Sequence, residues 1–443
     1  MIFCGQLSAR TKIACIGNSI TFGSGIVNRD HNSYPAQLQA YLGDEYEVVN
    51  FGVSGRTLLN KGDRPYTLTD EYARSLAFNP DIVLIKLGTN DSKPRNMQHL
   101  ADFDADYKAL IDSYKALESH PRIILLTPVK CYTPTVYDID SVAVSGSIVP
   151  AVKKAAVDNG VELLDLQNVF GERWEQHLMP DKVHPSSIGA GMVAEVIGRY
   201  LLRGTADAAG VVRENACIHA VPGNEYRQGA GWNEGNDWHT VADDIQLTLD
   251  GRKLDLLLLG NSITQGWGGT RKAVAYKPGK DVMDGMAGDL QWESAGISGD
   301  RTQNLLWRLR NYRYNVCTPG CVVIAIGINN LIAGDTPDDT AEGIVGVAEE
   351  AEKVFPDSKI ILLGVYPAGK DKGSSIREKC DSLHRLLAAH NFARAVYVDP
   401  TSWFTDANGN IRDGLYAGDY IHFTPEGYRT ATAQILRLTG RAD

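Results

Sequence analysis

The stretch Lys12–Gly23 reads KIACIGNSITFG, and the stretch Asp255–Gly266 reads DLLLLGNSITQG. In both, an apolar run leads directly into the same Gly-Asn-Ser-Ile-Thr turn. Three further pairs match in the same order: VNFGVSGRT at Val49–Thr57 with ESAGISGDRT at Glu293–Thr302, IVLIKLGTND at Ile82–Asp91 with VVIAIGINNL at Val322–Leu331, and DKVHP at Asp181–Pro185 with DYIHF at Asp419–Phe423. Matching residues lie about 240 positions apart throughout, which predicts two homologous domains of about 200 residues each.

The domain boundaries follow from where the repeat begins and ends. A length of 443 residues favours two or three domains. We expect a first domain over residues 1–204, a connecting segment over 205–237 and a second domain over 238–443. The connecting segment is rich in Gly, Asn and Ala. Trp238–Leu249 is expected to form a leading helix of the second domain.

Each copy alternates short apolar runs with longer segments of helical period. The strands expected in the first copy are Ile13–Ile16, Glu47–Asn50, Ile82–Leu87, Ile123–Thr127 and Glu162–Asp165, and its helices are Tyr34–Leu42, Leu68–Ala77, Asp102–Leu117, Val142–Asn159 and Ile188–Leu201. In the second copy the strands are Leu254–Leu259, Leu290–Ser294, Val322–Ile326, Lys359–Gly364 and Ala395–Val398, and its helices include Asn304–Leu309, Thr340–Val354, Ser375–His390 and Pro425–Leu438. Nearly continuous apolar strands between helices predict an α/β fold with a parallel sheet covered on both faces.

The composition narrows the classes of partner. Apolar residues make up 43% of the chain and charged residues 22%, which is typical of a globular protein with a full core. Lys and Arg number 44 against 54 Asp and Glu, a net charge of −10. This acidic balance argues against nucleic acid or an anionic membrane as the main partner. No apolar run approaches the roughly 18 residues of a membrane-spanning helix, so we expect no span. The oligomeric state is left open.

The seven cysteines show no pattern typical of a metal site. Cys317 and Cys321 lie four residues apart, but no second pair and no nearby histidine completes a zinc-binding set. We therefore expect buried or free thiols, no metal and no cofactor. The first ten residues, Met1–Arg10, are apolar and then small, and they fit either the tail of a signal peptide or a lead-in strand. A secreted or periplasmic location is favoured over a cytoplasmic one.

In the first copy, chemically useful side chains follow the carboxyl ends of successive strands. Ser19 follows the first strand, Gly55 the second and Asn90 the third. Ligands of a parallel sheet bind at these strand ends. Near the end of the copy, the spacing of Asp181 and His184 lets the carboxylate hold the imidazole. A Ser nucleophile, a His base and an Asp orienter form a hydrolytic triad, and N–H donors form an oxyanion hole.

The second copy repeats this set with the same residue types. Ser262, Gly299 and Asn329 follow its first three strands, and Asp419 precedes His422 by three residues. Taken alone, each motif also fits a purely structural role, because Gly-Asn-Ser is common in turns and Asn is common as a loop cap. Because four motifs occur in the same order in both copies, we interpret these residues as catalytic in each copy.

With these motifs the chain resembles the GDSL/SGNH hydrolase family over essentially its whole length, as a tandem pair. The family is named for the Ser, Gly, Asn and His that stand here as Ser19, Gly55, Asn90 and His184, and again as Ser262, Gly299, Asn329 and His422. The resemblance implies two flavodoxin-like three-layer α/β/α domains, each with a five-stranded parallel sheet. It also implies that Ser is the nucleophile and His the base, that Asp181 or Asp419 completes the triad, and that the Ser and Gly N–H groups with the Asn amide hold the oxyanion.

Three positions depart from the family's pattern. Asn18 and Asn261 stand where the usual motif has Asp, which implies a different local hydrogen-bond network. In the second copy Asn330 replaces the Asp that follows the oxyanion Asn, whereas the first copy keeps Asp91. This last change affects the residue that supports Asn329, not Asn329 itself.

The resemblance implies a serine esterase with two active sites that removes small acyl groups, most simply acetyl, from carbohydrate hydroxyls. The first copy resembles bacterial carbohydrate acetylesterases. The second resembles the branch of platelet-activating-factor acetylhydrolase subunits, through GISGDRTQNLLWRL at 296–309. Two alternatives stay open: a lipid or thioester acyl hydrolase, and one catalytic copy with a glycan-binding second copy. Trp267, five residues after Ser262 in a Gly-rich loop, is the expected pocket wall.

Overall fold

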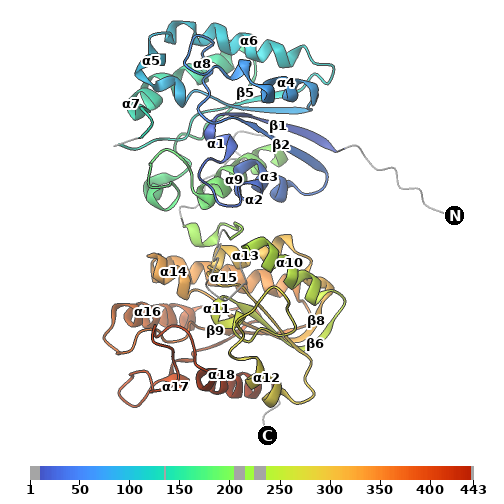
Figure 1. Cartoon of the computed structure of the whole chain (residues 1–443), viewed down its shortest axis with the longest axis vertical. Coiled ribbons are helices and arrows are strands. Elements are labelled where there is room, and N and C mark those ends of the chain that lie inside the picture. Colours follow the sequence, from blue (N-terminus) through green and yellow to red (C-terminus); the bar gives the residue numbers. More distant parts are fainter. Residues whose placement is uncertain (1–9, 134–135, 204–214, 224–235, 441–443) are drawn as a thin grey trace, which may run out of the picture. The chain divides into compact units, whose positions relative to one another are not determined.

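The computed structural model describes residues 10–133, 136–203, 215–223 and 236–440. The chain divides into two compact units, residues 1–214 and 215–443 (Figure 1). Each unit is built from alternating strands and helices.

Each unit holds a five-stranded sheet in which every neighbouring pair of strands is parallel. The first sheet has the order β2-β1-β3-β4-β5, with β1 at Thr11–Gly17, β2 at Tyr46–Gly52, β3 at Ile82–Lys86, β4 at Arg122–Leu126 and β5 at Glu162–Leu164. The second, written from its opposite edge, is β7-β6-β8-β9-β10, with β6 at Lys253–Gly260, β7 at Trp292–Gly296, β8 at Thr318–Ala325, β9 at Lys359–Leu363 and β10 at Val396–Val398. In each sheet the chain's second strand pairs outside the first, which is the flavodoxin-like order. The predicted fold class is confirmed.

Helices cover both faces of the first sheet (Figure 1). Successive side chains of β1 point to opposite faces, so each face contributes to its own hydrophobic cluster. Ile13 and Cys15 pack with α3 (Tyr34–Leu42) and α9 (Ser187–Arg203). Ala14 and Ile16 pack on the other face with α6 (Phe103–Lys115) and α8 (Val149–Asn159). The other α-helices of this unit are α1 (Ser19–Phe22), α2 (Arg29–Asn32), α4 (Asp70–Ala77), α5 (Pro94–Met97) and α7 (Ser141–Ala143).

The second sheet is covered in the same way (Figure 1). Leu256 and Leu258 of β6 pack in one cluster with residues of α12 (Lys280–Ala287) and α18 (Pro425–Leu438). Leu257 and Leu259 face the opposite cluster. That cluster draws on α10 (Trp238–Leu249), α13 (Thr302–Asn311), α15 (Pro337–Val354) and α16 (Ser375–Ala389); the short helices are α11 (Ser262–Gln265), α14 (Ile328–Ala333) and α17 (Thr401–Phe404).

Part of the segment expected as the interdomain connection belongs to the second unit. Of the segment 205–237, residues 215–223 and 236–237 are described. The amide of Asn215 donates to the carbonyl of Asp339 in α15, and the hydroxyl of Thr302 donates to the carbonyl of Cys217. Cys217 is 1% exposed. The expected boundary at residue 238 is therefore too late, because polar contacts fix residues 215–223 on α13 and α15.

The helix expected at Val142–Asn159 is interrupted. It consists of α7, a π-helical turn at Val144–Ile148, and α8. Pro150 stands in the first turn of α8 and has no N–H to donate to the preceding turn, which accounts for the break. Among the described residues, no helix is both long and apolar enough to cross a membrane.

Candidate active site

Each candidate nucleophile stands at the first residue of a short helix that follows the first strand of its unit. β1 ends at Gly17, Asn18 accepts a hydrogen bond from the N–H of Ile20, and Ser19 begins α1. A Cβ on Gly17 would lie 2.0 Å from Oγ1 of Thr21, so only glycine lets the chain turn this tightly. Gly260, Asn261 and Ser262 repeat the arrangement, with Asn261 capping the N–H of Ile263. Asn at these positions therefore serves as the helix cap.

In the first unit the three predicted triad residues form an unbroken chain of hydrogen bonds. Oγ of Ser19 lies 2.8 Å from Nε2 of His184, and Nδ1 of His184 lies 2.7 Å from Oδ2 of Asp181. Oδ1 of Asp181 accepts the backbone N–H groups of Val183 and His184 at 3.0 and 2.9 Å. The short loop between the two residues thus fixes the carboxylate before it meets the imidazole.

The second unit has the same geometry in a more exposed setting. Oγ of Ser262 lies 2.8 Å from Nε2 of His422, whose Nδ1 lies 2.7 Å from Oδ2 of Asp419. The side chains of His422 and Asp419 are 23% and 46% exposed, whereas those of His184 and Asp181 are 10% and 19% exposed. Water therefore reaches the second Asp–His pair more readily than the first.

Hydrogen bonds hold both carboxylates in their charged form. Burial raises the pKa of Asp181, but hydrogen bonds from the backbone of His184 and Val183 and from the His184 ring outweigh it, and the pKa is lowered overall. For Asp419, burial likewise raises the pKa, and hydrogen bonds from the His422 ring and backbone lower it further than burial raises it. Both carboxylates are therefore ionised at neutral pH, as a partner for a protonated imidazole must be.

The predicted oxyanion donors are positioned alike in the two units. Gly55 and Gly299 have φ values of +80° and +84°, a conformation that favours glycine. Nδ2 of Asn90 donates to the carbonyl of Arg56 at 3.0 Å, and Nδ2 of Asn329 donates to the carbonyl of Asp300 at 2.9 Å. Each Nδ2 carries a second hydrogen that is left for a ligand. In the described part of the chain, the backbone N–H groups of both serines and both glycines donate to no protein atom.

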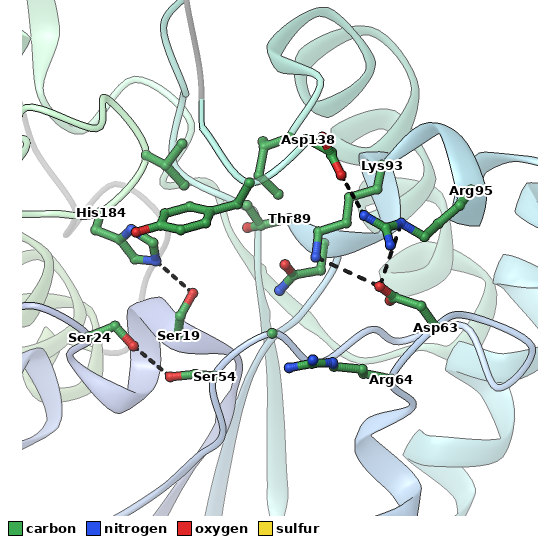
Figure 2. A pocket seen from close by; sticks show the side chains of 15 residues that line it. Ser19, Ser24, Ser54, Asp63, Arg64, Thr89, Lys93, Arg95, Asp138 and His184 are labelled. Carbon is green, nitrogen blue, oxygen red and sulfur yellow. Dashed lines mark hydrogen bonds and ion pairs between the residues drawn. The ribbon is translucent and has the colours of Figure 1, made fainter.

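The four family-type residues of the first unit line one pocket with a volume of about 480 Å³. Ser19, Gly55, Asn90 and His184 all contribute to its wall. Figure 2 shows Ser19 and His184 facing each other at this pocket. The ring of Tyr137 meets the imidazole of His184 edge-on at a centroid distance of 5.8 Å. Residues far apart in sequence therefore converge on one cavity beside the Ser19 hydroxyl.

The residues after the oxyanion asparagines support the loops by different bonds. Both oxygens of Asp91 accept backbone N–H groups, from Leu58 at 3.1 Å and Leu59 at 2.8 Å. Burial raises the pKa of Asp91 to about 6, although these hydrogen bonds lower it. Asn330 accepts the N–H of Thr302 at 3.0 Å and donates to Asp335 at 3.0 Å. The Asn330 amide thus accepts one backbone N–H where Asp91 accepts two, and it donates a hydrogen bond that a carboxylate cannot donate. Asn329 keeps the geometry of Asn90.

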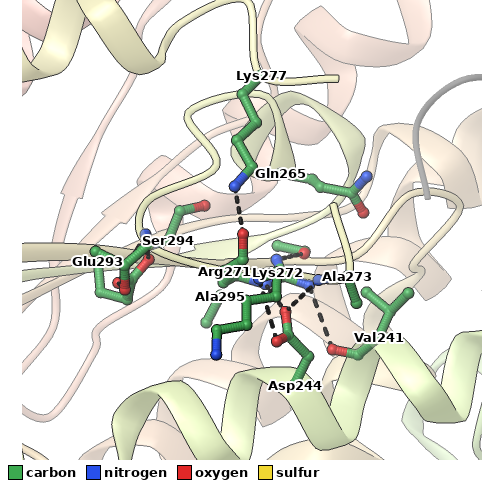
Figure 3. A network of polar contacts seen from close by, with 12 residues as sticks. Val241, Asp244, Gln265, Arg271, Lys272, Ala273, Lys277, Glu293, Ser294 and Ala295 are labelled. Atoms are coloured by element: carbon green, nitrogen blue, oxygen red, sulfur yellow. Dashed lines mark hydrogen bonds and ion pairs between the residues drawn. The ribbon is translucent and has the colours of Figure 1, made fainter. Parts of the chain in front are cut away.

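A buried polar network braces the second oxyanion loop. The fully buried Arg271 donates to the carbonyls of Gly296 and Val241 and lies 3.6 Å from the carboxylate of Asp244 (Figure 3). Lys277 donates to the carbonyl of Arg271. Gln265 accepts the backbone N–H of Ser298, next to Gly299. The loop after Ser262 and the loop that carries Gly299 are therefore tied together.

The prediction that Trp267 forms a pocket wall is wrong. Its side chain is 1% exposed and lies in the hydrophobic cluster between the sheet and α18. Its Nε1 donates to the hydroxyl of Thr432 at 3.0 Å, and its ring packs edge-on against Tyr428. The large apolar ring gains more from burial than from lining a wet site, because Thr432 satisfies its one polar atom.

Several pocket residues carry no motif and were not predicted. The hydroxyls of Ser24 and Ser54 lie 2.5 Å apart at the pocket, and Arg64 and Lys93 also line it (Figure 2). Arg64 stands in the loop between β2 and α4, whose path the sequence does not reveal. The only signal for Lys93 is its place three residues after Asn90.

Comparison with known proteins shows similarity of both units to esterases and acylhydrolases. Residues 15–192 and 258–430 each match the sequence model of the GDSL-like Lipase/Acylhydrolase family. The chain is 39% identical over 203 residues to an acetylxylan esterase of Xylanibacter ruminicola, covering 42% of each protein. It is 31% identical over 150 residues to the platelet-activating factor acetylhydrolase IB subunit alpha1 of Rattus norvegicus, covering 32% of this chain and 62% of that protein. The chain thus spans less than two thirds of the length of these relatives.

Solved structures that resemble part of the chain include a GDSL-like lipase and a two-domain esterase. A GDSL-like lipase from Bacteroides thetaiotaomicron aligns with a TM-score of 0.37 and 23% identity, covering 46% of this chain and 98% of that one. A two-domain esterase active on acetylated mannans aligns with a TM-score of 0.33 and 20% identity, covering 45% of this chain and 51% of that one. Because the family model matches most of the chain in two separate segments, the chain belongs to the GDSL-like lipase/acylhydrolase family.

Proposed function

We propose that both units are serine esterases that remove acetyl groups from carbohydrate hydroxyls. The observation that carries this proposal is the continuous Ser–His–Asp chain in each unit, with contacts of 2.8 and 2.7 Å in both. Serine, imidazole and carboxylate in this order are the parts of an acyl-transfer triad.

The reaction runs in two halves. His184 takes the proton of Ser19 as Oγ forms a bond to the acetyl carbon, and the carbonyl oxygen becomes an oxyanion between the N–H groups of Ser19 and Gly55 and the amide of Asn90. The sugar oxygen then leaves and takes the proton from His184, which leaves an acetyl-serine. Water attacks this ester, gives its proton to His184, and acetate leaves as Ser19 is restored.

Ser262, His422 and Asp419 carry out the same steps in the second unit, with Gly299 and Asn329 as the oxyanion donors. In each unit the Asp remains ionised and stabilises the imidazolium that forms during both halves. Its hydrogen bond to Nδ1 also keeps Nε2 as the atom that faces the serine.

Two observations support a small acyl group on a sugar. An acetylxylan esterase is 39% identical to this chain over the 203 aligned residues. The first pocket is lined by hydroxyl-bearing and charged side chains, among them Ser24, Ser54 and Thr89, which suit the hydroxyls of a carbohydrate.

Single and double serine variants test this proposal. We expect Ser19→Ala and Ser262→Ala each to lower the turnover of its own site by on the order of 10⁴-fold. The double variant is expected to release no acetate from acetylated xylo-oligosaccharides. Release by the double variant at the wild-type rate would reject the mechanism. If Ser262→Ala changed no substrate's turnover while Ser19→Ala abolished activity, the second copy would not be catalytic.

A second candidate is a lipid-type or thioester acyl hydrolase, which the 31% identity to the platelet-activating factor acetylhydrolase subunit favours. A series of p-nitrophenyl esters of increasing chain length separates the two. The acetylesterase proposal expects the highest kcat/KM for acetate. An optimum at about eight carbons or more would reject it in favour of the lipid-type hydrolase.

A further inference from the structure

The first pocket has a cationic end that the ester chemistry does not use. Lys93 is only 8% exposed, yet its side chain lines the pocket three residues after Asn90. Its ammonium group lies 3.9 Å from Oδ2 of Asp63, which is longer than a hydrogen bond. A lysine buried to this degree is costly unless its charge is fully compensated.

Arg64 adds a second cation at the same end. Its Nη1 lies 3.4 Å from where a Cβ of Gly55 would be, which places the guanidinium beside the oxyanion loop. Within the described part of the chain, this guanidinium takes part in no hydrogen bond or ion pair. Figure 2 shows Arg64 and Lys93 extending into the pocket on the side away from His184.

The carboxylates of the pocket do not balance these cations. Oδ2 of Asp63 lies 3.9 Å from Lys93 and 3.8 Å from Arg95, and its other oxygen accepts the amide of Asn96 at 3.0 Å. Asp138 is bound by Arg95 at 2.5 Å. Arg64, Lys93 and Arg95 thus face only two carboxylates, Asp63 and Asp138, so this end of the pocket carries a net positive charge although the chain as a whole is at −10.

The second copy differs at the matching position. The residue three after Asn329 is Ile332, whose side chain is 50% exposed. Lys93 is therefore not required by the shared fold or by the shared triad. It is a feature that distinguishes the first site.

We propose that the first site selects acetyl esters on sugars that carry a carboxylate, and that Lys93 and Arg64 bind that carboxylate. This inference rests on the proposed esterase function and adds the substrate class. The carboxylate supplies the missing anion at the cationic end while the ester lies between Ser19 and the oxyanion donors. A charge-assisted contact of this kind is worth roughly tenfold or more in affinity.

The test uses two substrates that differ only at the sixth carbon of the sugar, which is a carboxylate in one and a neutral hydroxymethyl group in the other: a p-nitrophenyl glucuronide and a p-nitrophenyl glucoside, each O-acetylated at the same ring hydroxyl. Acetate release is measured in the Ser262→Ala background, so that only the first site acts, and Ser19→Ala reports the background of the second site. The readout is the ratio of kcat/KM between the glucuronide and the glucoside. We expect a ratio of roughly ten or more, which falls as salt is added because ions screen the contact.

Variants at the cationic end locate the origin of this ratio. Lys93→Met and Arg64→Gln are expected to bring it toward one, and Lys93→Arg to retain most of it. Lys108→Met is the matched control, since Lys108 is 64% exposed on α6 and pairs with Asp112; it is expected to leave the ratio unchanged. Arg64 is exposed, so its variant keeps the test valid if Lys93→Met fails to fold.

The outcomes separate the inference from the function on which it rests. If the Ser262→Ala protein cleaves both substrates with equal kcat/KM, or if Lys93→Met and Arg64→Gln leave the ratio unchanged, the carboxylate site is rejected and the esterase function stands. If neither substrate loses acetate, the proposed function fails and this inference fails with it.

Discussion

Nε1 of the fully buried Trp238 donates a 2.6 Å hydrogen bond to Oδ1 of Asp300. The backbone carbonyl of Asp300 accepts the amide of Asn329, and its Oδ2 forms a buried ion pair with Arg308 at 2.8 Å. The first residue of α10 thus holds the segment that positions an oxyanion donor of the second site.

Trp238→Phe is expected to slow the second site selectively. The substitution leaves Oδ1 of Asp300 buried without its donor, at a cost of about 1–3 kcal/mol in unfolding free energy. Because Asp300 orients Asn329, kcat of the second site should fall by about tenfold in a Ser19→Ala background. Trp307→Phe is the matched control, as Trp307 packs edge-on against Trp238 at 5.6 Å. A loss of stability with unchanged kcat would show that Trp238 has only a structural role.

Asp181→Asn is expected to reduce first-site turnover by about 10²–10⁴-fold. The amide can still accept the two backbone N–H groups at Oδ1, but it presents N–H to Nδ1 of His184. The ring then carries its proton on Nε2 and cannot accept the proton of Ser19. Asp419→Asn should cost less, because Asp419 is 46% exposed and water can take over part of its role. Acetate release measured in single-site backgrounds checks both, and an equal or larger loss for Asp419→Asn contradicts this ranking.

Asp91 and Asn330 are expected not to be interchangeable. The two oxygens of Asp91 each accept one backbone N–H group. In Asp91→Asn an NH2 group replaces one of these oxygens and faces a backbone N–H that it cannot accept. Asn330→Asp places a second carboxylate beside Asp335 and loses a donated hydrogen bond. Each exchange should lower the unfolding free energy of its unit by about 1–3 kcal/mol, as measured by chemical denaturation. Full stability in both variants would mean that these bonds do not support the loops.

The stability of the first unit should depend on pH through Asp91. Burial raises its pKa from 3.8 to about 6, so the folded state binds this proton more tightly than the unfolded state. Its contribution is fully present below about pH 4 and is lost as the pH rises through about 6. Asp91→Asn lacks this titration. The stability deficit of the variant relative to wild type should therefore shrink between pH 4.5 and 7.5, and a deficit that widens would contradict the assignment.

The sequence was sufficient for the fold and for the residues that converge at the sheet edge. Ser19, Gly55 and Asn90 follow three strands that lie side by side in a parallel sheet, so strand order alone brings them together. The Asp–His spacing needs only a short loop, and the repeat supplied an independent second reading of each motif. Buried strands and their motifs are local signals, which is why they could be located without a structure.

What the sequence did not reveal depends on loop paths and on tertiary burial. Trp267 reads as a pocket residue by its distance from Ser262, yet the loop turns it into the core against Tyr428. Residues 215–223 look like a linker by composition, but Asn215 and Cys217 are fixed by contacts to distant helices. Arg64 and Lys93 face the pocket only because the chain between β2 and α4 and the start of α5 fold over it.

Stoichiometric labelling with a serine-directed sulfonyl fluoride, read by intact mass, tests most directly whether each unit holds an activated serine. It requires no knowledge of the natural substrate. The wild-type chain should take up two adducts, Ser19→Ala and Ser262→Ala one each, and the double variant none. A single adduct on the wild-type chain, or labelling that persists in the double variant, would contradict the presence of two triads that activate Ser19 and Ser262.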